Sequence, residues 1–536
     1  MALSSKIKVA MPKIGVIIRN SGRYQYVYKV LKSYRNSKGQ PTNDRVAIGR
    51  LDPESGMLIP NDNYYEHYSN NETDVDIELL PAYDSVRSVG ATFFFKRIFD
   101  VLGLAEILKK VLGNQRAQTA LTACLYMVCR GNVLEHVLDY CEGFTLHETP
   151  LSPQGASALF GSITHDERMA FFKLWIIRQR QPQYLAYDVT SFSTYAQGIA
   201  DSEWGYNRDG DRLPQINLGC YLGQQSGLPL FYVTYPGSIL DKSHLPYMMA
   251  YNAELGIQDV GFVMDRGFCT TANMGYMHAE HLSFIIGVEV RHKATREAIE
   301  SVRDNITSMR YRLSQGIFAR CVHGRFYGIT STMHVYYDPE SAERQRRDLF
   351  RTVESIEEKL LQLKQITVRE AKHYSAYFRI SRQDNGAFSF VRDYDKIDIA
   401  DMNNGFFCIL SNTDSNSEEI LDIYRRKDMI EKGFDDLKNH LDMKRMRTHT
   451  SATTDGKLFL AFISLIAVSW MGSQMNDFMK QKSMSKDSVI SELEKIKVIT
   501  TSTSKRLMNP ITKTQRLILE SIDLTENDLK SYVIAT

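Results

Sequence analysis

The chain has 536 residues, of which 43% are hydrophobic and 24% are charged. Single hydrophobic cores stop growing near ~250–300 residues, so a chain of this length is expected to form several domains. The formal net charge is only +2, so the overall charge does not point to a nucleic-acid-binding protein. The seven cysteines include no CxxC pair, which argues against a zinc site and a disulfide framework and fits a reducing compartment.

The first residues carry the positive charge that the chain as a whole does not show. Residues 1–50 hold eleven Lys and Arg against the single acid Asp44, a balance of +11 − 1 = +10. The cations are Lys6, Lys8, Lys13, Arg19, Arg23, Lys29, Lys32, Arg35, Lys38, Arg45 and Arg50, interleaved with Tyr24, Tyr26, Tyr28 and Tyr34. Basic, aromatic, hairpin-like segments are suited to contact the DNA backbone. We expect residues 1–60 to be a basic β-rich DNA-binding segment.

The sign of the charge reverses in residues 51–84, which contain nine acids and no Lys or Arg. The acids are Asp52, Glu54, Asp62, Glu66, Glu72, Asp74, Asp76, Glu78 and Asp84. Two interpretations stay open, a linker and a mask for the basic segment. Residues 91–112 and 118–141 then show helical periodicity, so residues 61–183 are expected to form an acidic linker and a helical region. Ordinary helical packing and a helix-turn-helix that binds DNA ends both fit this region.

The next segment alternates strand and helix patterns. YLAYDVTSFS reads as a buried strand, and residues 215–237 read as a hairpin whose turn lies around Gln224–Gly227. A helical pattern follows, then the strand of DVGFVMDRGF, a short helix over residues 272–281 and the strand of LSFIIGVEV. This order predicts an α/β fold with a mixed sheet and helices packed on it. Residues 184–290 are thus expected to form the first part of an α/β core.

Two aspartates stand in these buried strands. Asp188 lies within YLAYDVTSFS, and Asp265 closes the apolar run of GFVMDRGF. A buried carboxylate without a partner costs several kcal/mol, so each needs a metal, a cation or hydrogen bonds. In open α/β sheets, chemistry collects at the carboxyl ends of strands, where Asp265 lies. The alternative for either residue alone is an acid in a turn or cap. The nearby Asp241 and His244 are expected in such a turn-and-cap role, and Asp209 and Asp211 in a solvated loop.

A third acid lies in a predicted helix. Tyr424, Lys427, Glu431 and Lys438 are spaced by three, four and seven residues, which places them on one helical face. The alternative is an ordinary solvated charged face. Further acids flank Glu431, and a run of cations follows that includes Lys444, Arg445 and Arg447. A carboxylate that can bind metal, beside a run of cations, suits a substrate made of phosphates.

These residues resemble the DDE transposases of bacterial insertion sequences, which have an RNase H-like core. The helix is similar to the signature Y-x2-R-x3-E-x6-K, with Lys427 in place of the usual Arg. Lys binds phosphate as a point charge, whereas the planar guanidinium of Arg can donate two parallel hydrogen bonds to it. LSPQGASALF, YNRDGDRLPQINLG and YPGSILD also resemble this group, and the likeness runs from about residue 15 to about residue 515.

The resemblance implies a catalytic and metal-binding triad of Asp188, Asp265 and Glu431. It implies two Mg²⁺ ions, with Mn²⁺ as a substitute, and a reaction in which a cut DNA end joins target DNA. Tyr424, Lys427, Lys438, Lys444 and Arg445 are the expected DNA-binding residues. The expected partners are the terminal inverted repeats, the target DNA and a second copy of the chain in a homodimer.

The last two acids are separated by 431 − 265 = 166 residues, too many for one strand and a connection. Because GFFCILSNT reads as a core strand, residues 291–402 are expected to be an insertion subdomain, with a charged long helix and a hairpin turning at Asp-Asn-Gly. Insertions of the resembled group often contact the element end; a merely decorative subdomain is the alternative. Residues 403–475 would complete the core, and residues 476–536 would form a C-terminal helical region.

The most apolar stretch, residues 458–472, is too short to span a bilayer, which takes ~20 residues, so we expect a buried core helix. No signal peptide or membrane partner is expected, and the expected location is the cytoplasm, in association with the nucleoid. Two other functions stay open. One is an RNase H-type nuclease that cuts without joining, and the other is a non-catalytic or regulatory DNA-binding derivative of a transposase.

Overall fold

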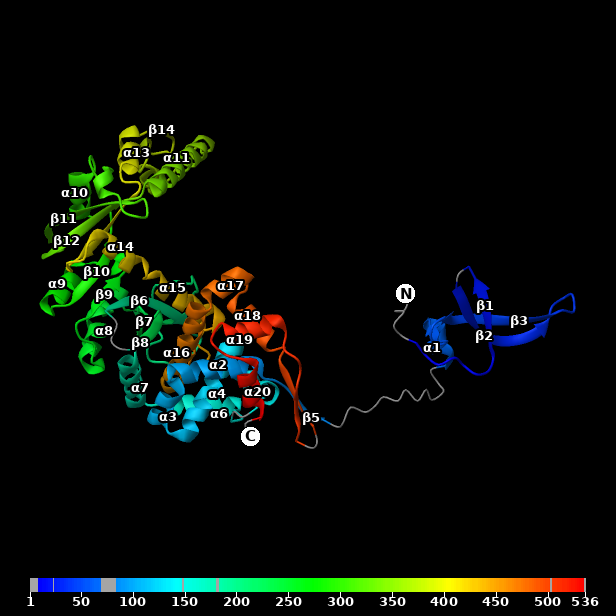
Figure 1. Ribbon diagram of the computed structural model, residues 1–536. Helices are drawn as coiled ribbons and strands as arrows, with labels where there is room; N and C mark the ends of the chain where they lie inside the picture. The colour runs from blue at the N-terminus through cyan, green and yellow to red at the C-terminus, as the bar shows by residue number, and fades with distance from the viewer. Residues whose placement is uncertain are drawn as a thin grey trace. The chain divides into compact units, whose positions relative to one another are not determined.

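The computed structural model describes residues 8–22, 24–68, 83–146, 149–179, 183–501 and 504–534. The chain divides into two compact units, residues 1–83 and 84–536, which are described separately (Figure 1). Lys6 and Arg23 of the basic segment lie outside the described residues. So do Glu72, Asp74, Asp76 and Glu78 of the acidic segment.

The first unit is a small antiparallel sheet with one helix. Its strands are β1 (Val16–Ser21), β2 (Tyr24–Arg35), β3 (Pro41–Leu51) and β4 (Leu58–Pro60), in that order, followed by α1 (Asp62–Tyr68). A core of Val27, Ile48, Leu58 and Tyr64 holds the unit together. The predicted tyrosine-rich hairpin is confirmed as β2 and β3, and its cations stand beside aromatic rings. The Arg50 guanidinium lies 5.0 Å from the ring centre of Tyr24.

The second unit is built on an eight-stranded sheet in the order β11-β12-β15-β10-β9-β6-β7-β8. Its first five strands along the chain are β6 (Tyr184–Ser193), β7 (Gln215–Gly223), β8 (Leu228–Pro236), β9 (Gly261–Met264) and β10 (Ser283–Val288). β6, β7 and β8 form an antiparallel meander, β9 is parallel to β6, and β10 is parallel to β9. Three antiparallel strands followed by two parallel ones is the topology of the RNase H-like fold, which confirms the predicted fold class.

The connections follow the predicted alternation. Between β8 and β9 lies α8 (Asp241–Leu255), and between β9 and β10 lie a 3₁₀ turn (Arg266–Phe268) and α9 (Thr271–Ala279). β15 (Phe406–Ser411) then pairs antiparallel with β10. Every residue of β7 and β9 is buried, as the apolar runs predicted.

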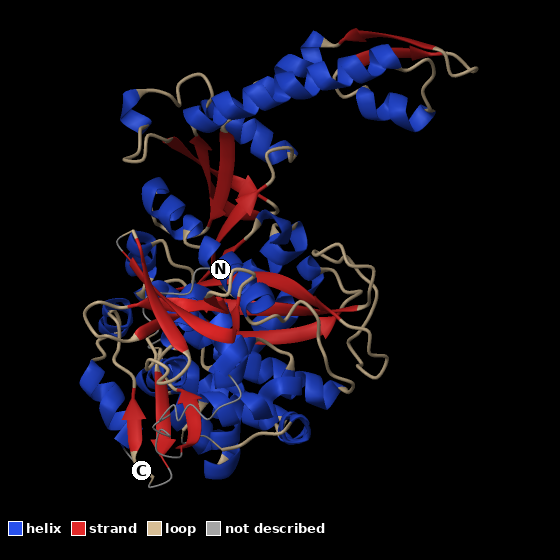
Figure 2. Cartoon of the chain, turned by 90° about the vertical axis from the view of Figure 1, so that its right-hand side faces the viewer, coloured by secondary structure: helices blue, strands red, loops and turns tan. Residues whose placement is uncertain are grey.

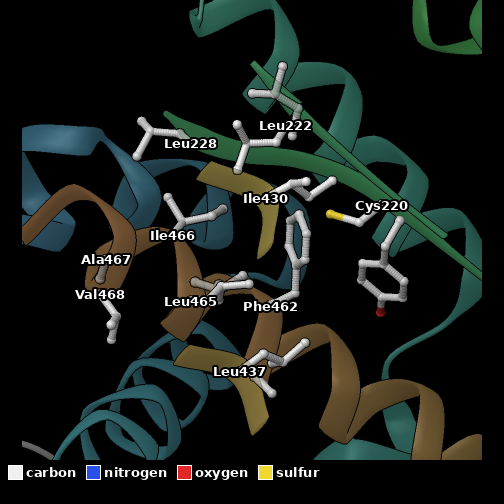
Figure 3. Packing of buried hydrophobic residues seen from close by; sticks show 14 of the residues in the cluster. Cys220, Leu222, Leu228, Ile430, Leu437, Phe462, Leu465, Ile466, Ala467 and Val468 are labelled. Carbon is white, nitrogen blue, oxygen red and sulfur yellow. The ribbon is translucent and has the colours of Figure 1, made fainter. Parts of the chain in front are cut away.

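A long apolar helix, α16 (Ser451–Gln474), lies at the centre of the unit. Its side chains Phe462 and Leu465 pack with Leu222 and Leu228 of the sheet (Figure 3). Among the described helices, it alone is long and apolar enough to cross a membrane, but 78% of its most apolar window is buried inside the protein. The prediction of a buried core helix is therefore confirmed.

The helical region before the sheet packs against α16 through α2, α4 and α6. It consists of α2 (Gly90–Leu102), α3 (Leu104–Leu112), α4 (Asn114–Arg130), a 3₁₀ turn (Leu134–His136), α5 (Val137–Phe144), α6 (Pro153–Ser162) and α7 (His165–Arg178). α6 begins with Pro153 after the N-cap Ser152, whose side chain accepts from the Gly155 amide. α6 and α16 touch so closely that a Cβ at Gly456 would overlap the Phe160 carbonyl oxygen.

Residues 291–402 contribute both to the sheet and to a separate small core. After α10 (Lys293–Val302) and a 3₁₀ turn (Met309–Tyr311), β11 (Phe318–Phe326) and β12 (Ile329–Tyr337) extend the sheet through pairing of β12 with β15. The elements that follow have their own apolar cluster and lie together in two views (Figures 1 and 2). They are α11 (Pro339–Gln362), α12 (Val368–Tyr374), β13 (Phe378–Arg382), β14 (Phe388–Arg392) and α13 (Tyr394–Asp401).

The remaining elements cover the region around Glu431 and the C-terminal part of the chain. α14 (Ser417–Arg425), α15 (Asp428–Asp435) and a π-helical turn (Asp436–His440) follow β15. After α16 come α17 (Asn476–Lys482), α18 (Lys486–Leu493), β16 (Lys497–Thr501), β17 (Arg506–Met508), α19 (Lys513–Glu520) and α20 (Glu526–Ile534). β16 pairs with β17 and with β5 (Tyr83–Ser88).

Candidate active site

The three predicted acids line one cavity of about 480 Å³. Asp188 comes from β6, Asp265 follows the last residue of β9, and Glu431 comes from α15. Because Tyr187 and Met264 are paired in the parallel register of β6 and β9, Asp188 and Asp265 occupy the next position on two neighbouring strands. Apolar packing of Ile430 against the core fixes α15, and Glu431 with it, beside the sheet (Figure 3).

The environment of Asp188 disfavours the charged form of its carboxyl group. Its pKa is raised to about 6, chiefly by burial and to a smaller extent by the nearby Asp265 carboxylate, while the Val189 amide, Lys427 and Arg208 oppose the shift. The Val189 amide donates to Asp188 Oδ1 at 2.8 Å. A carboxyl whose pKa is raised by burial and by a like charge is typical of a functional site.

Asp265 is held by a hydrogen bond from Tyr424. The phenol donates to Asp265 Oδ1 at 3.3 Å, and burial together with this carboxylate raises the pKa of Tyr424. The phenol reaches the carboxylate over Gly287 of β10, where any Cβ would overlap the Tyr424 hydroxyl. A glycine at this strand position therefore makes room for the contact.

Lys427 lies among the acids. Its Nζ is 3.1 Å from Glu431 Oε1, and its side chain is 6% exposed, against 62% for Glu431. Burial alone would lower the pKa of Lys427, but Asp265, Asp188 and Glu431 raise it above its usual value. The ammonium group therefore stays charged and offsets part of the negative charge of the three carboxylates.

The expectation of one continuous helical stripe was wrong. The helix ends at Arg425 and starts again at Asp428, and the Lys427 amide donates to the Tyr424 carbonyl at 3.1 Å in a tight turn. A π-helical turn then shifts Lys438 away from the stripe. Across the first break, Tyr424 still reaches Asp265 and Lys427 still reaches Glu431.

Lys438 lies outside the cavity lining and holds the loop between β6 and β7. Its Nζ is 2.7 Å from Asp209 Oδ2. Arg445 likewise contacts Asp211 at 3.4 Å and lies over the ring of Tyr195. Asp209 and Asp211 are therefore not simply solvated loop acids, as expected, because each has a cationic partner.

The Lys444 side chain is exposed, and it is the backbone of this residue that pairs with β6. The Ser193 amide donates to the Lys444 carbonyl at 3.0 Å, and the Met446 amide donates to the Ser193 carbonyl at 2.9 Å. This pairing runs beside the end of β6. It places Lys444 and Arg445 beside the last residue of β6, five residues along the strand from Asp188, and neither side chain lines the cavity.

A model of the family described as "Transposase DDE domain" matches residues 179–467, more than half of the chain. The chain belongs to the DDE transposase family. A search of the solved structures gives a piggyBac transposase synaptic complex with hairpin DNA, at 10% identity and a TM-score of 0.34, over 71% of this chain and 70% of that one. A likeness this weak carries no information on geometry. A search of curated proteins found no match.

Arg208 and Asp241 of the transposase also line the cavity, although the sequence patterns did not assign them to the site. Arg208 comes from the loop between β6 and β7, and Asp241 is the first residue of α8. The two side chains form an ion pair, and Tyr235 donates to Asp241 Oδ1 at 2.7 Å. The N-cap of α8 is Leu240, without a side-chain capping hydrogen bond. Asp241 pairs with Arg208 and Tyr235 in place of the turn-and-cap role expected for it. The segments YNRDGDRLPQINLG and YPGSILD, which resemble the family, contain both residues and were the available signal.

The donor set of this transposase fits a hard divalent cation. Three carboxylates converge on one cavity, and carboxylate oxygens are the ligands that Mg²⁺ and Mn²⁺ prefer. In the described part of the chain, no three His, Cys, Asp or Glu side chains are already spaced to hold a metal ion. The charge of Lys427 stands among the carboxylates instead. Asp188, Asp265 and Glu431 are the side chains that would hold the metal.

Proposed function

We propose that the chain is an active transposase that cuts phosphodiester bonds at the ends of an insertion sequence and joins the freed 3′-OH to target DNA. The observation that supports this most strongly is the convergence of Asp188, Asp265 and Glu431 on one cavity of an RNase H-like core. Two bound Mg²⁺ ions, or Mn²⁺ in their place, would activate the attacking hydroxyl and neutralise charge at the phosphate.

The chain's own residues prepare this chemistry in three ways. Asp188 must be deprotonated to act as a ligand, and the nearby Lys427 and Arg208 favour its charged form against the effect of burial. Tyr424 fixes the orientation of Asp265. Lys427 offsets part of the carboxylates' charge before metal enters, and it then becomes available for a phosphate oxygen near the reacting bond.

The DNA is proposed to contact several parts of the chain. The basic hairpin of the first unit supplies exposed cations for the backbone of the terminal inverted repeats. Lys444 and Arg445 lie beside the last residue of β6, where they would contact the DNA backbone, and Lys438 supports the loop between β6 and β7 rather than the phosphate itself. Two DNA ends have to be brought together, so we propose a homodimer that acts on the chromosome in the cytoplasm.

The experiment is a strand-transfer assay with the full chain. A labelled duplex that ends in the terminal repeat flanking the gene is incubated with supercoiled plasmid in Mg²⁺ or in EDTA. The proposal predicts Mg²⁺-dependent cutting at the repeat and labelled plasmid as the joined product. Cutting without joined product would favour a nuclease of the RNase H type. Binding without any cutting would favour a regulatory DNA-binding derivative.

A further inference from the structure

The Arg208–Asp241 pair lines the cavity beside the three acids, and the chemistry assigned to those acids gives it no role. We propose that Arg208 binds a phosphate of the DNA beside the reacting bond, and that Asp241 holds the guanidinium in position until DNA enters. This inference rests on the proposed function and adds a specific substrate-binding residue to it.

Arg208 faces the same space as the three acids. It lines the cavity with Asp188, Asp265 and Glu431, and its side chain is 29% exposed. It lies close enough to Asp188 to lower the pKa of that carboxyl, in opposition to burial. A DNA phosphate that enters the cavity would therefore come within reach of this guanidinium.

The loop presents Arg208 in a fixed position. The residue before it, Asn207, donates to Ser193 Oγ at 2.9 Å and accepts from the Asp209 and Asp211 amides at 2.9 and 3.2 Å. The residue after it, Asp209, is bound by Lys438. Because hydrogen bonds and an ion pair already hold both neighbouring residues, little backbone conformational entropy is lost when Arg208 binds a phosphate.

Asp241 is a suitable temporary partner for this guanidinium. Its Oδ2 pairs with Arg208, and its Oδ1 accepts from Tyr235, a residue that is 2% exposed and stacked on His244. The carboxylate is thus fixed by a buried phenol. A guanidinium has five N–H donors in a fork that matches a phosphate, so one pairing with Asp241 leaves donors for DNA.

The alternative is a purely structural pair that ties the loop to α8. The two cases predict opposite effects of the two single substitutions. If Arg208 binds phosphate, its removal weakens DNA binding, whereas removal of the Asp241 charge frees the guanidinium and eliminates a repulsive carboxylate. If the pair is structural, breaking it from either side has the same effect, because both substitutions remove the same ion pair.

The test measures binding of a fluorescent terminal-repeat duplex in EDTA over a range of salt concentrations, so that no cutting occurs. The variants are Arg208→Gln, Arg208→Lys and Asp241→Asn, with Arg212→Gln as the matched control. Arg212 is exposed in the same loop and does not line the cavity. Thermal unfolding midpoints establish that each variant is folded.

Arg208→Gln is expected to bind the duplex ~10-fold more weakly and to lower the log–log salt slope by ~0.9, the value expected when one phosphate is no longer neutralised. Arg208→Lys should keep the parental salt slope, because the positive charge is retained. Its affinity for the duplex should lie between those of the parent and Arg208→Gln, because lysine cannot donate the two parallel hydrogen bonds of a guanidinium. Asp241→Asn should bind as tightly as the parent or more tightly, and Arg212→Gln should match the parent.

Equal decreases in affinity for Arg208→Gln and Asp241→Asn would overturn the inference in favour of a structural pair. An unchanged affinity and salt slope for Arg208→Gln would overturn it as well. The parent's own cutting in Mg²⁺ is measured in parallel. If the parent cuts and the Arg208 variant binds normally, only the inference fails; if the parent does not cut, the proposed function fails independently.

Discussion

At the scale of single residues, the site consists of acids and cations that balance one another. Lys427 is nearly buried, contacts Glu431 and lies close to Asp188 and Asp265, so its charge is already part of the site before any ligand is present. Spacing predicted that Lys427 and Glu431 face the same way. It could not predict that Arg208 and Asp241 share the cavity, because their approach depends on how a loop and α8 fold over the sheet.

Substitution of Lys427 tests this balance directly. Lys427→Arg should keep cutting of the terminal-repeat duplex within ~10-fold of the parent, because the cation is retained and a second hydrogen bond to phosphate becomes available. Lys427→Glu should lower cutting by at least the ~10²–10³-fold that removal of one preorganised group costs, because a fourth carboxylate repels DNA. Cutting of labelled duplex in Mg²⁺ measures both. Parental rates for the Glu variant would show that Lys427 takes no part in the reaction.

At the scale of elements, periodicity predicted most strands and helices of the core. β6 through β10 and the connecting helices lie where the apolar runs indicated, because their fully buried faces leave a clear pattern. The break between α14 and α15 and the π-helical turn were not predictable, since both depend on contacts distant in sequence. Lys438, for example, is bound by Asp209, 229 residues earlier.

The β2–β3 hairpin of the first unit is expected to contact DNA. Lys32 and Lys38 are exposed near its turn, and neither lies in the unit's core. Replacing both by Gln should weaken DNA binding and lower the log–log salt slope by ~0.9 for each phosphate that the variant no longer neutralises, without changing the fold. Salt-dependent binding of the terminal-repeat duplex provides the measurement. An unchanged slope would mean that these cations do not touch the DNA.

At the scale of the whole molecule, a buried lysine joins the helical region to the catalytic sheet. Lys457 of α16 is 1% exposed and donates to the Asn132 carbonyl and side chain, each at 3.0 Å. Asn132 in turn donates to the carbonyl of Arg445 at 3.3 Å, in the segment that pairs beside β6. Burial, helped by the nearby Arg447, lowers the pKa of Lys457 to about 7. No sequence pattern marks such a lysine within an apolar helix.

This buried lysine should make stability depend on pH. Between pH 7 and about 10.5, the unfolded chain binds one proton that the folded chain does not. The contribution of Lys457 to the free energy of unfolding should therefore rise with pH in this window, by at most ~1.4 kcal/mol per pH unit, and this contribution should be lowest below pH 7. Urea unfolding at several pH values measures the effect. In the Lys457→Met variant, the free energy of unfolding should not show this rise between pH 7 and about 10.5. Parallel plots of the free energy of unfolding against pH for the two proteins would contradict the prediction.

Asp188, Asp265 and Glu431 are the residues on which the proposed reaction depends. Mg²⁺-dependent cutting of the terminal-repeat duplex by Asp188→Asn, Asp265→Asn and Glu431→Gln measures that dependence. Asp428→Asn, an exposed acid on the same helix as Glu431, serves as the control. Each triad variant is expected to bind the duplex but not to cut it, and the control is expected to cut like the parent. A triad variant that cuts at the parental rate would contradict the assignment of the catalytic site.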